Sequence, residues 1–457
     1  MTDSKRNCDL GMVGLGVMGR NLLLNMADHG YAVAGYDQDP NQVKQLQEES
    51  DPLVVHGTTD IQEFIDALRR PRAIMMLVPA GPIVDSVIQA LLPHLEAGDL
   101  IIDAGNSYFK DTDRRAQDLT TKGIQFLGVG ISGGEEGARH GPSIMPGGPK
   151  AAYERVRPIL EAVAAKVNGD PCVTYLGPGS AGHFVKMVHN GIEYGIMQLI
   201  SESYDLMKRG LNFNDDQLRD VYNEWNQGDL NCYLIEITSR IFGKVDEKTG
   251  NRLINDILPV AKQNGTGMWT SQSAMELQIP VPTIDLAVSM RDLSVFSKER
   301  AEKSKMYSRA IIPISGDQKA FVTQLSRSLF AAMKMTYRQG FAVMKAASVK
   351  YQYDLDLKAV SRIWQGGCII RSKILNSNIL DQPLLTIDQE ALRQVVCDAI
   401  TSGIPIPGLM VSLSYFDAYR SAWLPANLIQ AQRDYFGAHT YERTDMAGTF
   451  HTEWEKP

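Results

Sequence analysis

Five polar side chains recur on one side of a predicted helix within an otherwise apolar segment. They are Lys186, His189, Asn190, Glu193 and Tyr194, and their spacing places them on one face of a 3.6-residue repeat. A helix that is apolar on its other sides is normally buried. Burying an amine, an imidazole and a carboxylate is costly unless they face a cavity that uses them. The stripe therefore predicts a functional cavity, and a solvated polar face is the alternative.

A glycine-rich loop near the N-terminus predicts a dinucleotide site. The sequence Gly14-Leu-Gly-Val-Met-Gly19 directly follows a short apolar strand and opens an apolar helix, which a second strand follows. In this context Gly14 permits a tight turn, Gly16 lets the backbone approach a pyrophosphate, and Gly19 lets the helix pack on the strand. The helix N-terminus adds partial positive charge. A glycine-rich turn without a ligand is the alternative.

Asp37 stands at the end of the second strand, 18 residues after Gly19. A carboxylate at this place accepts hydrogen bonds from the 2′-hydroxyl of a ribose, and it would repel the 2′-phosphate of NADP. We therefore expect NAD to be preferred, with NADP possible. The alternative is a capping or turn aspartate before Pro40.

Strands and helices alternate through the first third of the chain, and helices fill the rest. This order predicts an α/β Rossmann dinucleotide-binding domain with a parallel, doubly wound sheet, then a large all-α domain and a tail. The expected strands are 73–78, 100–103 and 125–129, between helices 61–70, 83–95 and 111–122. Later helices are expected at 181–209, 216–225, 233–242, 252–261, 282–304, 317–348, 357–375 and 390–401. The expected domains are 1–179, 180–436 and a partner-docking tail, 437–457.

Two polar turns follow strands of this sheet, where ligands of such folds bind. One contains Asn106, and the other is Ser132-Gly133-Gly134, whose backbone N–H groups can hold a carboxylate. The second turn could equally be an ordinary surface turn.

The composition excludes several classes of protein. The 457 residues are 44% hydrophobic and 22% charged, with a net charge of −7, which gives no general footprint for nucleic acid or an anionic membrane. Five cysteines without CxxC spacing argue against a metal knuckle or a disulfide framework. The chain shows neither a signal peptide nor a run of about 18 apolar residues. We expect a cytoplasmic protein without a metal.

Taken together, these motifs resemble the decarboxylating 6-phosphogluconate dehydrogenase family of the long bacterial and eukaryotic type. The resemblance runs from end to end of the chain. It covers Gly14–Gly19, Asp103–Ser107, Val129–Arg139, Gly182–Tyr194, Gly265–Gly267, Trp364–Arg371 and Leu424–Glu442.

The resemblance implies oxidation of 6-phospho-D-gluconate at C3, loss of C1 as CO2 and release of ribulose 5-phosphate, in the oxidative pentose phosphate pathway. It implies that Lys186 is the base that takes the C3 hydroxyl proton and that Glu193 protonates the enediol. The lysine must then enter the cycle neutral. The implied substrate contacts are Asn106, Ser132, Gly133, Gly134, His189, Asn190, Tyr194, Thr266, Arg291, Arg433 and His439. The implied cofactor contacts are Gly14, Leu15, Gly16, Val17, Met18, Gly19, Asp37, Val78, Ala80 and Asn106.

The resemblance further implies that Arg433 and His439 reach the substrate phosphate of a partner subunit, so the active unit would be a homodimer. Two departures from the family pattern matter. After the second strand the run Tyr36–Pro40 lacks the arginine that grips the 2′-phosphate of NADP in many members, and Asn264 replaces a phosphate-binding lysine. A lesser difference is Pro79, where a lysine near the cofactor is usual. Two alternatives remain: a dehydrogenase of the same superfamily acting on an unphosphorylated β-hydroxyacid, and a catalytically silent dinucleotide sensor.

Overall fold

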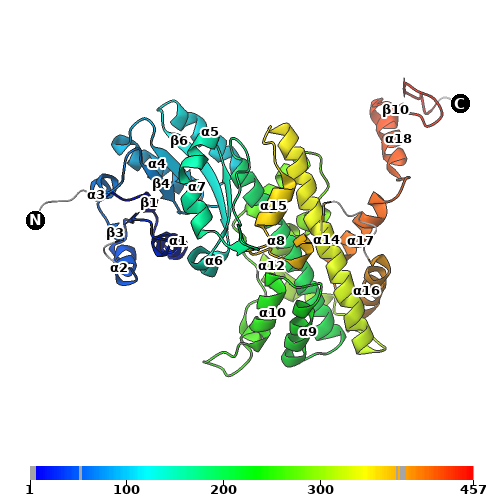
Figure 1. The fold of residues 1–457 in the computed structure, drawn as a ribbon. Helices are drawn as coiled ribbons and strands as arrows, with labels where there is room; N and C mark the ends of the chain where they lie inside the picture. Colours follow the sequence, from blue (N-terminus) through cyan, green and yellow to red (C-terminus); the bar gives the residue numbers. More distant parts are fainter. Residues whose placement is uncertain (1–6, 51–53, 377–378, 381–387, 456–457) are drawn as a thin grey trace, which may run out of the picture.

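The computed structural model describes residues 7–50, 54–376, 379–380 and 388–455. An α/β domain packs against a helical body, from which a C-terminal arm projects (Figure 1). Among the described residues, no helix combines the length and the hydrophobicity that a membrane crossing requires. All five cysteines are free thiols, as expected.

The α/β domain is built on one sheet of seven strands in the order β3-β2-β1-β4-β5-β6-β7. The first six strands are parallel, which confirms the predicted Rossmann arrangement. The expectation of an all-parallel sheet was wrong at one edge, because β7 pairs antiparallel with β6. The strands are β1 (Leu10–Val13), β2 (Val33–Tyr36), β3 (Val55–Thr58), β4 (Ala73–Met76), β5 (Leu100–Asp103), β6 (Gln125–Ser132) and β7 (Ser143–Gly147).

Helices cover both faces of this sheet, and each face has its own apolar core. Such burial on both faces explains why the strands read as continuous apolar runs rather than alternating patterns. One core involves α1 (Val17–Asp28), α2 (Pro40–Glu48), α6 (Gly134–His140) and α7 (Lys150–Val163). The other involves α3 (Ile61–Asp66), α4 (Pro82–Leu91) and α5 (Phe109–Thr120). The helices predicted at 61–70 and 83–95 are shorter in the structure. They end at Asp66 and at Leu91, and a 3-10 turn at Leu92–His94 follows the second.

The helical body is organised around two long helices that pack side by side, α8 (Ala181–Asp205) and α14 (Gln318–Lys350). The helix expected at 181–209 ends in a π-helical turn, Leu206–Gly210. The other helices are α9 (Asp215–Gln227), α10 (Tyr233–Gly243), α11 (Thr266–Glu276), α12 (Pro282–Val295), α13 (Ser297–Met306), α15 (Leu357–Ile363), α16 (Gln389–Ser402) and α17 (Pro407–Tyr419).

Three expected helices were wrong in extent. Residues 252–261 form only a 3-10 turn, Leu253–Asp256, and 282–304 is broken at Phe296 into α12 and α13. The segment 357–375 is helical only to Ile363 and again at Lys373–Asn376, because its centre contains the pair Gly366-Gly367. Gly367 adopts a positive φ of 65°.

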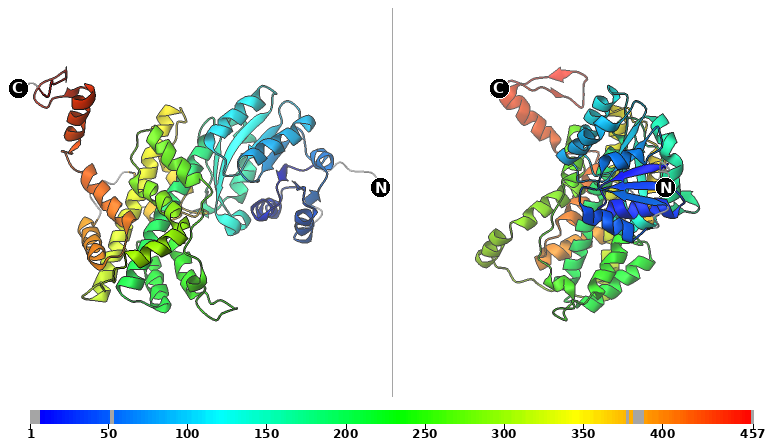
Figure 2. Two further views of the ribbon diagram at one scale, coloured as in Figure 1. Left: turned by 180° about the vertical axis from the view of Figure 1, so that it is seen from behind. Right: turned by 90° about the vertical axis from the view of Figure 1, so that its left-hand side faces the viewer.

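The C-terminal arm comprises α18 (Ala426–Gly437) and a small hairpin of β10 (Tyr441–Glu442) and β11 (Thr449–Phe450). It extends away from the body beyond α17 (Figures 1 and 2). Its only fully buried polar residue among those described is Asp434. That carboxylate accepts hydrogen bonds from Thr440, His451, Thr452 and Trp454. The arm is thus ordered by its own contacts.

Candidate active site

Helix α8 lies directly on the backbone of β6 because small residues face each other there. A Cβ on Gly130 would come within 2.3 Å of the Cβ of Lys186, and one on Gly182 would come within 2.3 Å of the Gly128 carbonyl oxygen. These glycines let the helix approach until Lys186 lies beside the strand. The sequence analysis assigned no role to Gly128 and Gly130, although their alternation on one strand face is the signal of such close packing.

Four polar groups form a connected network at the start of the stripe. The Lys186 amine donates to Asn190 Oδ1 at 2.5 Å, and the same oxygen lies 3.0 Å from His189 Nδ1. Because an amide oxygen only accepts, His189 carries its proton on Nδ1. Its Nε2 then accepts from the Ser132 hydroxyl at 3.0 Å. Ser132 from the strand end and the three helix residues Lys186, His189 and Asn190 are therefore brought together.

A backbone contact that sequence reasoning missed holds Ser132 in place. The Ile369 N–H donates to the Ser132 hydroxyl at 3.3 Å, and the Trp364 ring meets the His189 ring edge-on at 5.6 Å. Both belong to the Trp364–Arg371 motif, which the sequence analysis singled out without a role. The neighbouring Gly133 and Gly134 have positive φ values and begin α6, so this turn needs glycine.

Burial shifts the pKa values of three groups in the stripe toward their uncharged forms. Lys186 is 6% exposed, and burial lowers its pKa, while nearby Glu193 raises it. Burial raises the pKa of Glu193, opposed by the charges of Lys186 and Arg291. Burial and the charge of Lys186 hold the pKa of His189 well below its usual value. The alternative of a solvated polar face is therefore wrong, because burial disfavours the charged form of each of these three groups.

A second cluster carries a cation at the far end of the stripe. The Arg291 guanidinium of α12 lies 3.4 Å from the centre of the Tyr194 ring, a cation–π contact. Burial lowers the pKa of Arg291. Thr266 is buried at the start of α11, and a Cβ on Gly267 would meet the Tyr194 ring at 2.4 Å. Tyr194, Thr266 and Arg291 thus lie close to one another, as predicted.

The glycine-rich loop opens onto a cavity of about 620 Å³. The cavity lies between the ends of β1, β4 and β5 and the start of α1, where a dinucleotide binds in this fold. Asn264 also lines it, two residues before Thr266 of the second cluster. The lining residues include Gly16, Val17, Met18, Gly19, Val78, Pro79, Ala80, Asn106 and Asn264.

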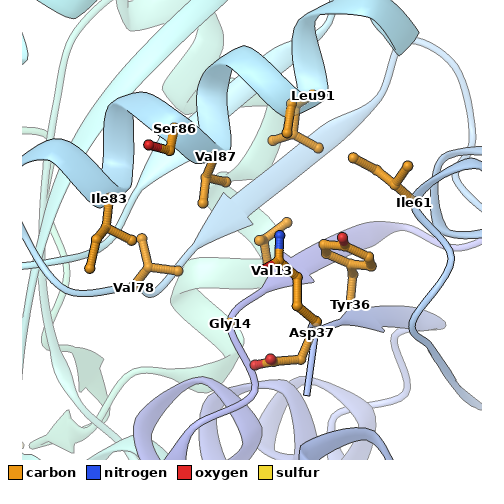
Figure 3. Close-up of a pocket in the computed structure, with 12 residues that line it drawn as sticks. Val13, Gly14, Tyr36, Asp37, Ile61, Val78, Ile83, Ser86, Val87 and Leu91 are labelled. Atoms are coloured by element: carbon orange, nitrogen blue, oxygen red, sulfur yellow. The ribbon is translucent and has the colours of Figure 1, made fainter. Parts of the chain in front are cut away.

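An adjoining apolar cavity of about 250 Å³ lies beside the end of β2 (Figure 3). Gly14, Asp37, Val78 and Ile83 are among its lining residues, and its shape and polarity suit an adenosine. Among the described residues that line it, Asp37 alone is charged, and none is a lysine or arginine.

Both oxygens of Asp37 are held by backbone groups. Oδ2 accepts from the Leu15 N–H at 2.8 Å, and Oδ1 accepts from the Asp39 N–H at 2.9 Å. The helix cap before Pro40 is Asp39, which accepts from the Asn41 N–H. The capping alternative therefore applies to Asp39, whereas Asp37 makes the side-chain bond of a turn aspartate and also lines the cavity. The side chain of Leu15 is buried in the core, so only its backbone N–H, which holds Asp37, takes part in this region.

Arg433 and His439 do not join the cluster within one chain. Both side chains are exposed on the arm, where Arg433 donates to Gln430 and the His439 ring contacts Phe436. The arm projects away from the stripe (Figure 2).

Comparison with known proteins relates this chain to one family. The family model described as the NAD binding domain of 6-phosphogluconate dehydrogenase matches residues 9–177. The model described as the C-terminal domain of 6-phosphogluconate dehydrogenase matches residues 182–454. Together the two cover the chain almost completely.

Full-length relatives agree with this assignment. The NADP(+)-dependent, decarboxylating 6-phosphogluconate dehydrogenase of Bacillus subtilis is 49% identical, over 98% of this chain and 99% of its own length. The decarboxylating enzyme of Escherichia coli is 46% identical, over 97% and 98%. The solved 6-phosphogluconate dehydrogenase of Plasmodium falciparum, described with NADP+ and with 6-phosphogluconate, superposes with a TM-score of 0.92 at 42% identity, covering 98% of this chain and 100% of that one. This chain belongs to the 6-phosphogluconate dehydrogenase family.

Proposed function

We propose that this chain oxidises 6-phospho-D-gluconate with NAD(P)+ and decarboxylates the product to D-ribulose 5-phosphate and CO2, in the oxidative pentose phosphate pathway. The observation that carries the proposal is the pair of buried Lys186 and half-buried Glu193 on one face of α8, whose pKa values burial shifts toward the neutral forms. A dinucleotide cavity lies beyond the same strand ends. A catalytically silent sensor would not need this pair.

The pair supplies the proton transfers that the reaction needs. A nicotinamide bound in the dinucleotide cavity would supply the acceptor for the hydride of C3. Neutral Lys186 takes the proton of the C3 hydroxyl, and the resulting ammonium donates a hydrogen bond to the new C3 carbonyl oxygen while CO2 leaves, then returns its proton to that oxygen to give the enediol. Protonated Glu193 delivers its proton to C1 of the enediol while Lys186 accepts the proton of the neighbouring hydroxyl, which gives the hydroxymethyl end and the carbonyl of ribulose 5-phosphate. Asn190 and His189 orient the sugar hydroxyls through the network that they share with Lys186.

In this proposal the substrate phosphate binds at Tyr194, Thr266 and Arg291. The guanidinium of Arg291 can bind two phosphate oxygens at once. The partner's Arg433 and the partner's His439 complete this site in a homodimer. Support for the dimer comes from the arm, which exposes large apolar side chains that water does not favour. These are Trp423, Leu424, Leu428, Ile429, Tyr435 and Phe436.

The direct test follows reduction of the nicotinamide and release of CO2 when purified enzyme meets 6-phosphogluconate. Both should appear in equal amounts. An unphosphorylated β-hydroxyacid should be a poor substrate, because it leaves the Arg291 site empty. Turnover of that acid with none of 6-phosphogluconate would overturn the proposal.

NAD preference is a finer part of the proposal. The B. subtilis relative is NADP(+)-dependent by name, so this chain would differ from it. The support is Asp37, which lines the adenosine cavity among described residues that include no cation. A 2′-phosphate close to this carboxylate would cost about 2–4 kcal/mol at intermediate dielectric, or roughly 30- to 1000-fold.

Steady-state kcat/KM for the two cofactors tests the preference. Asp37→Ser should shift the ratio toward NADP. Asp39→Asn is the matched control, because Asp39 caps α2 and is not among the residues that line the cavity. A wild-type enzyme that clearly prefers NADP would contradict this part of the proposal and leave the reaction unchanged.

We also retain, as a proposal, the division into residues 1–179, 180–436 and 437–457. The arm of the structure begins before this last boundary, at α18, so α18 is grouped with the tail. A cytoplasmic location is proposed on the same footing, supported by five free thiols and a net charge of −7.

A further inference from the structure

A buried arginine outside the catalytic stripe lies behind the dinucleotide cavity. The side chain of Arg115, on α5, is 2% exposed, and the proposed mechanism gives it no role. Buried guanidinium groups require partners in several directions because each carries five N–H donors in a fixed plane. The partners of Arg115 lie in two regions, the β4–α4 loop with the start of α4, and the end of β5 with the loop that follows it.

The first set of contacts reaches the loop between β4 and α4. Nη2 donates to the Gly81 carbonyl oxygen at 3.0 Å. Nε and Nη2 also make a two-pronged pair with the Asp85 carboxylate, with both distances at 2.9 Å. Gly81 immediately follows Pro79 and Ala80, which line the larger cavity.

The second set reaches the loop that follows β5. Nη1 lies 3.4 Å from the Ser107 hydroxyl oxygen and 3.7 Å from Asp103 Oδ2. Asp103 in turn accepts from the Ser107 hydroxyl at 2.6 Å and from the Gly105 N–H at 3.1 Å. These bonds define the turn that carries Asn106, and this turn forms another part of the cavity wall.

We propose that Arg115 is a positioning residue for cofactor binding, which fixes the loop 79–81 relative to the loop 104–107. This inference rests on the proposed function for the identity of the ligand, a nicotinamide dinucleotide. Arginine suits the role because its planar fork can bond a carboxylate, a carbonyl and a hydroxyl at once. Lysine offers one point charge and cannot hold the same three directions.

The experiment compares Arg115→Gln and Arg115→Lys with Arg114→Gln in the full-length protein. Arg114 pairs with the same Asp85 carboxylate, but its side chain is 50% exposed, and it contacts Asp85 and Asp111 rather than the loop residues 79–81 or 104–107. Calorimetric titration with NAD+ and with NADP+ gives the dissociation constants. Thermal unfolding reports folding, and steady-state kinetics separate KM from kcat.

We expect Arg115→Gln to raise the dissociation constant and the KM of the dinucleotide about 10- to 100-fold, as misplaced binding groups do. Arg115→Lys should recover part of this loss, and Arg114→Gln should change little. A folded Arg115→Gln protein with an unchanged dissociation constant and only a lower Tm would overturn the inference, because the arginine would then be merely structural.

Ser107→Ala keeps the inference testable if Arg115→Gln does not fold. It removes the hydrogen bond of Arg115 to the second loop, and leaves the pair with Asp85 and the 3.7 Å approach to Asp103 intact. Its dissociation constant for the dinucleotide should rise severalfold, and an unchanged value would overturn the inference. The outcome is independent of the proposed reaction: wild-type protein that binds dinucleotide without turning over 6-phosphogluconate would contradict only the proposed function.

Discussion

The polar side chains of the α8 stripe are buried or half-buried, whereas those proposed for the site on the C-terminal arm are exposed. Lys186, His189 and Asn190 are buried, and one chain supplies their hydrogen-bond partners. Arg433 and His439 are exposed on an arm whose apolar side chains also face water. The stripe needs no second chain to take its form, whereas the arm has surface left to bury.

The comparison teaches which half of the site one chain can build. The proposed acid–base groups and the arginine proposed to bind the substrate phosphate are in place within the chain. The other side chains proposed for the phosphate lie on a separately ordered arm, in which four donors hold the pKa of Asp434 to about 2 against the opposing effect of burial. Our account is that the stripe performs the chemistry and the partner's arm completes the substrate site.

The largest expected effect is at the stripe. Lys186→Met should reduce turnover by on the order of 10²–10⁴ or more, because oxidation loses its base. Pre-steady-state absorbance of the reduced nicotinamide is the measurement, and it should show no burst. Near-normal turnover would show that another group is the base.

Glu193→Gln is the matched comparison on the same helix face. It should leave the first hydride transfer largely intact and slow the later protonation of the enediol. A burst of reduced nicotinamide followed by slow turnover would separate the two roles. Equal loss of the burst in both variants would contradict them.

Truncating the arm should reduce turnover almost as strongly as Lys186→Met, because it removes a phosphate contact rather than the base. Deletion of the residues after Tyr435 should abolish activity with 6-phosphogluconate, because the phosphate site loses the partner's His439. Dinucleotide binding should stay largely intact, since both cavities belong to the N-terminal domain apart from Asn264. Calorimetry with NAD+ and sedimentation of the truncated protein check this. A fully active monomer would contradict the account.

A smaller effect is expected from restoring a cation within one chain. Asn264→Lys should lower the KM for 6-phosphogluconate, because a lysine–phosphate contact is stronger than an amide contact by roughly 1.5–3 kcal/mol. That difference corresponds to about 10–150-fold. Steady-state KM measurements decide the matter. An unchanged or higher KM would show that another cation has already replaced the lost one.

The smallest effect is on the pH dependence of stability, and it comes from the contact between α8 and α17. Glu202 of α8 is 3% exposed and accepts from the backbone N–H groups of Gly408 and Leu409 at the start of α17, which leads to the arm. Burial, together with the charge of Asp205, raises its pKa from 4.5 to about 7 against these donors. The folded protein therefore binds more protons than the unfolded chain between these pH values.

Stability should consequently fall as the pH rises from 4.5 to about 7, with a contribution from Glu202 on the order of 3 kcal/mol. Urea unfolding at a fixed protein concentration gives the slope for the wild type. Glu202→Gln should make that slope flatter in this window. Identical slopes in the two proteins would show that Glu202 does not titrate there.

Local pattern predicted the parts of the site that lie on regular elements. The spacing of Lys186, His189 and Glu193 and the loop from Gly14 to Gly19 depend only on helix geometry and turn sterics, so the sequence sufficed. The resemblance to a family added Thr266 and Arg291, which come together through the packing of α11 and α12. The helix expected at 252–261 failed because an apolar periodic pattern alone does not reveal missing tertiary support.

Contacts that cross the fold could not be read from the chain. The Ile369 N–H on Ser132 and the two-loop contacts of Arg115 join residues that are distant in sequence. Neither has a spacing that a periodic pattern could indicate. The arm shows the same limit, because a surface that it is proposed to cover on a second copy cannot be read from one chain.

The most direct test of the account uses hybrid dimers. Lys186→Met and Arg433→Gln chains, each with a different tag, are produced together, and dimers that carry both tags are isolated. Each variant alone should be nearly inactive. If the arm completes the partner's site, a hybrid contains one site with Lys186 from one chain and Arg433 from the other. Purified hybrids should then regain roughly half of the wild-type activity. Hybrids no more active than the separate variants would contradict the account.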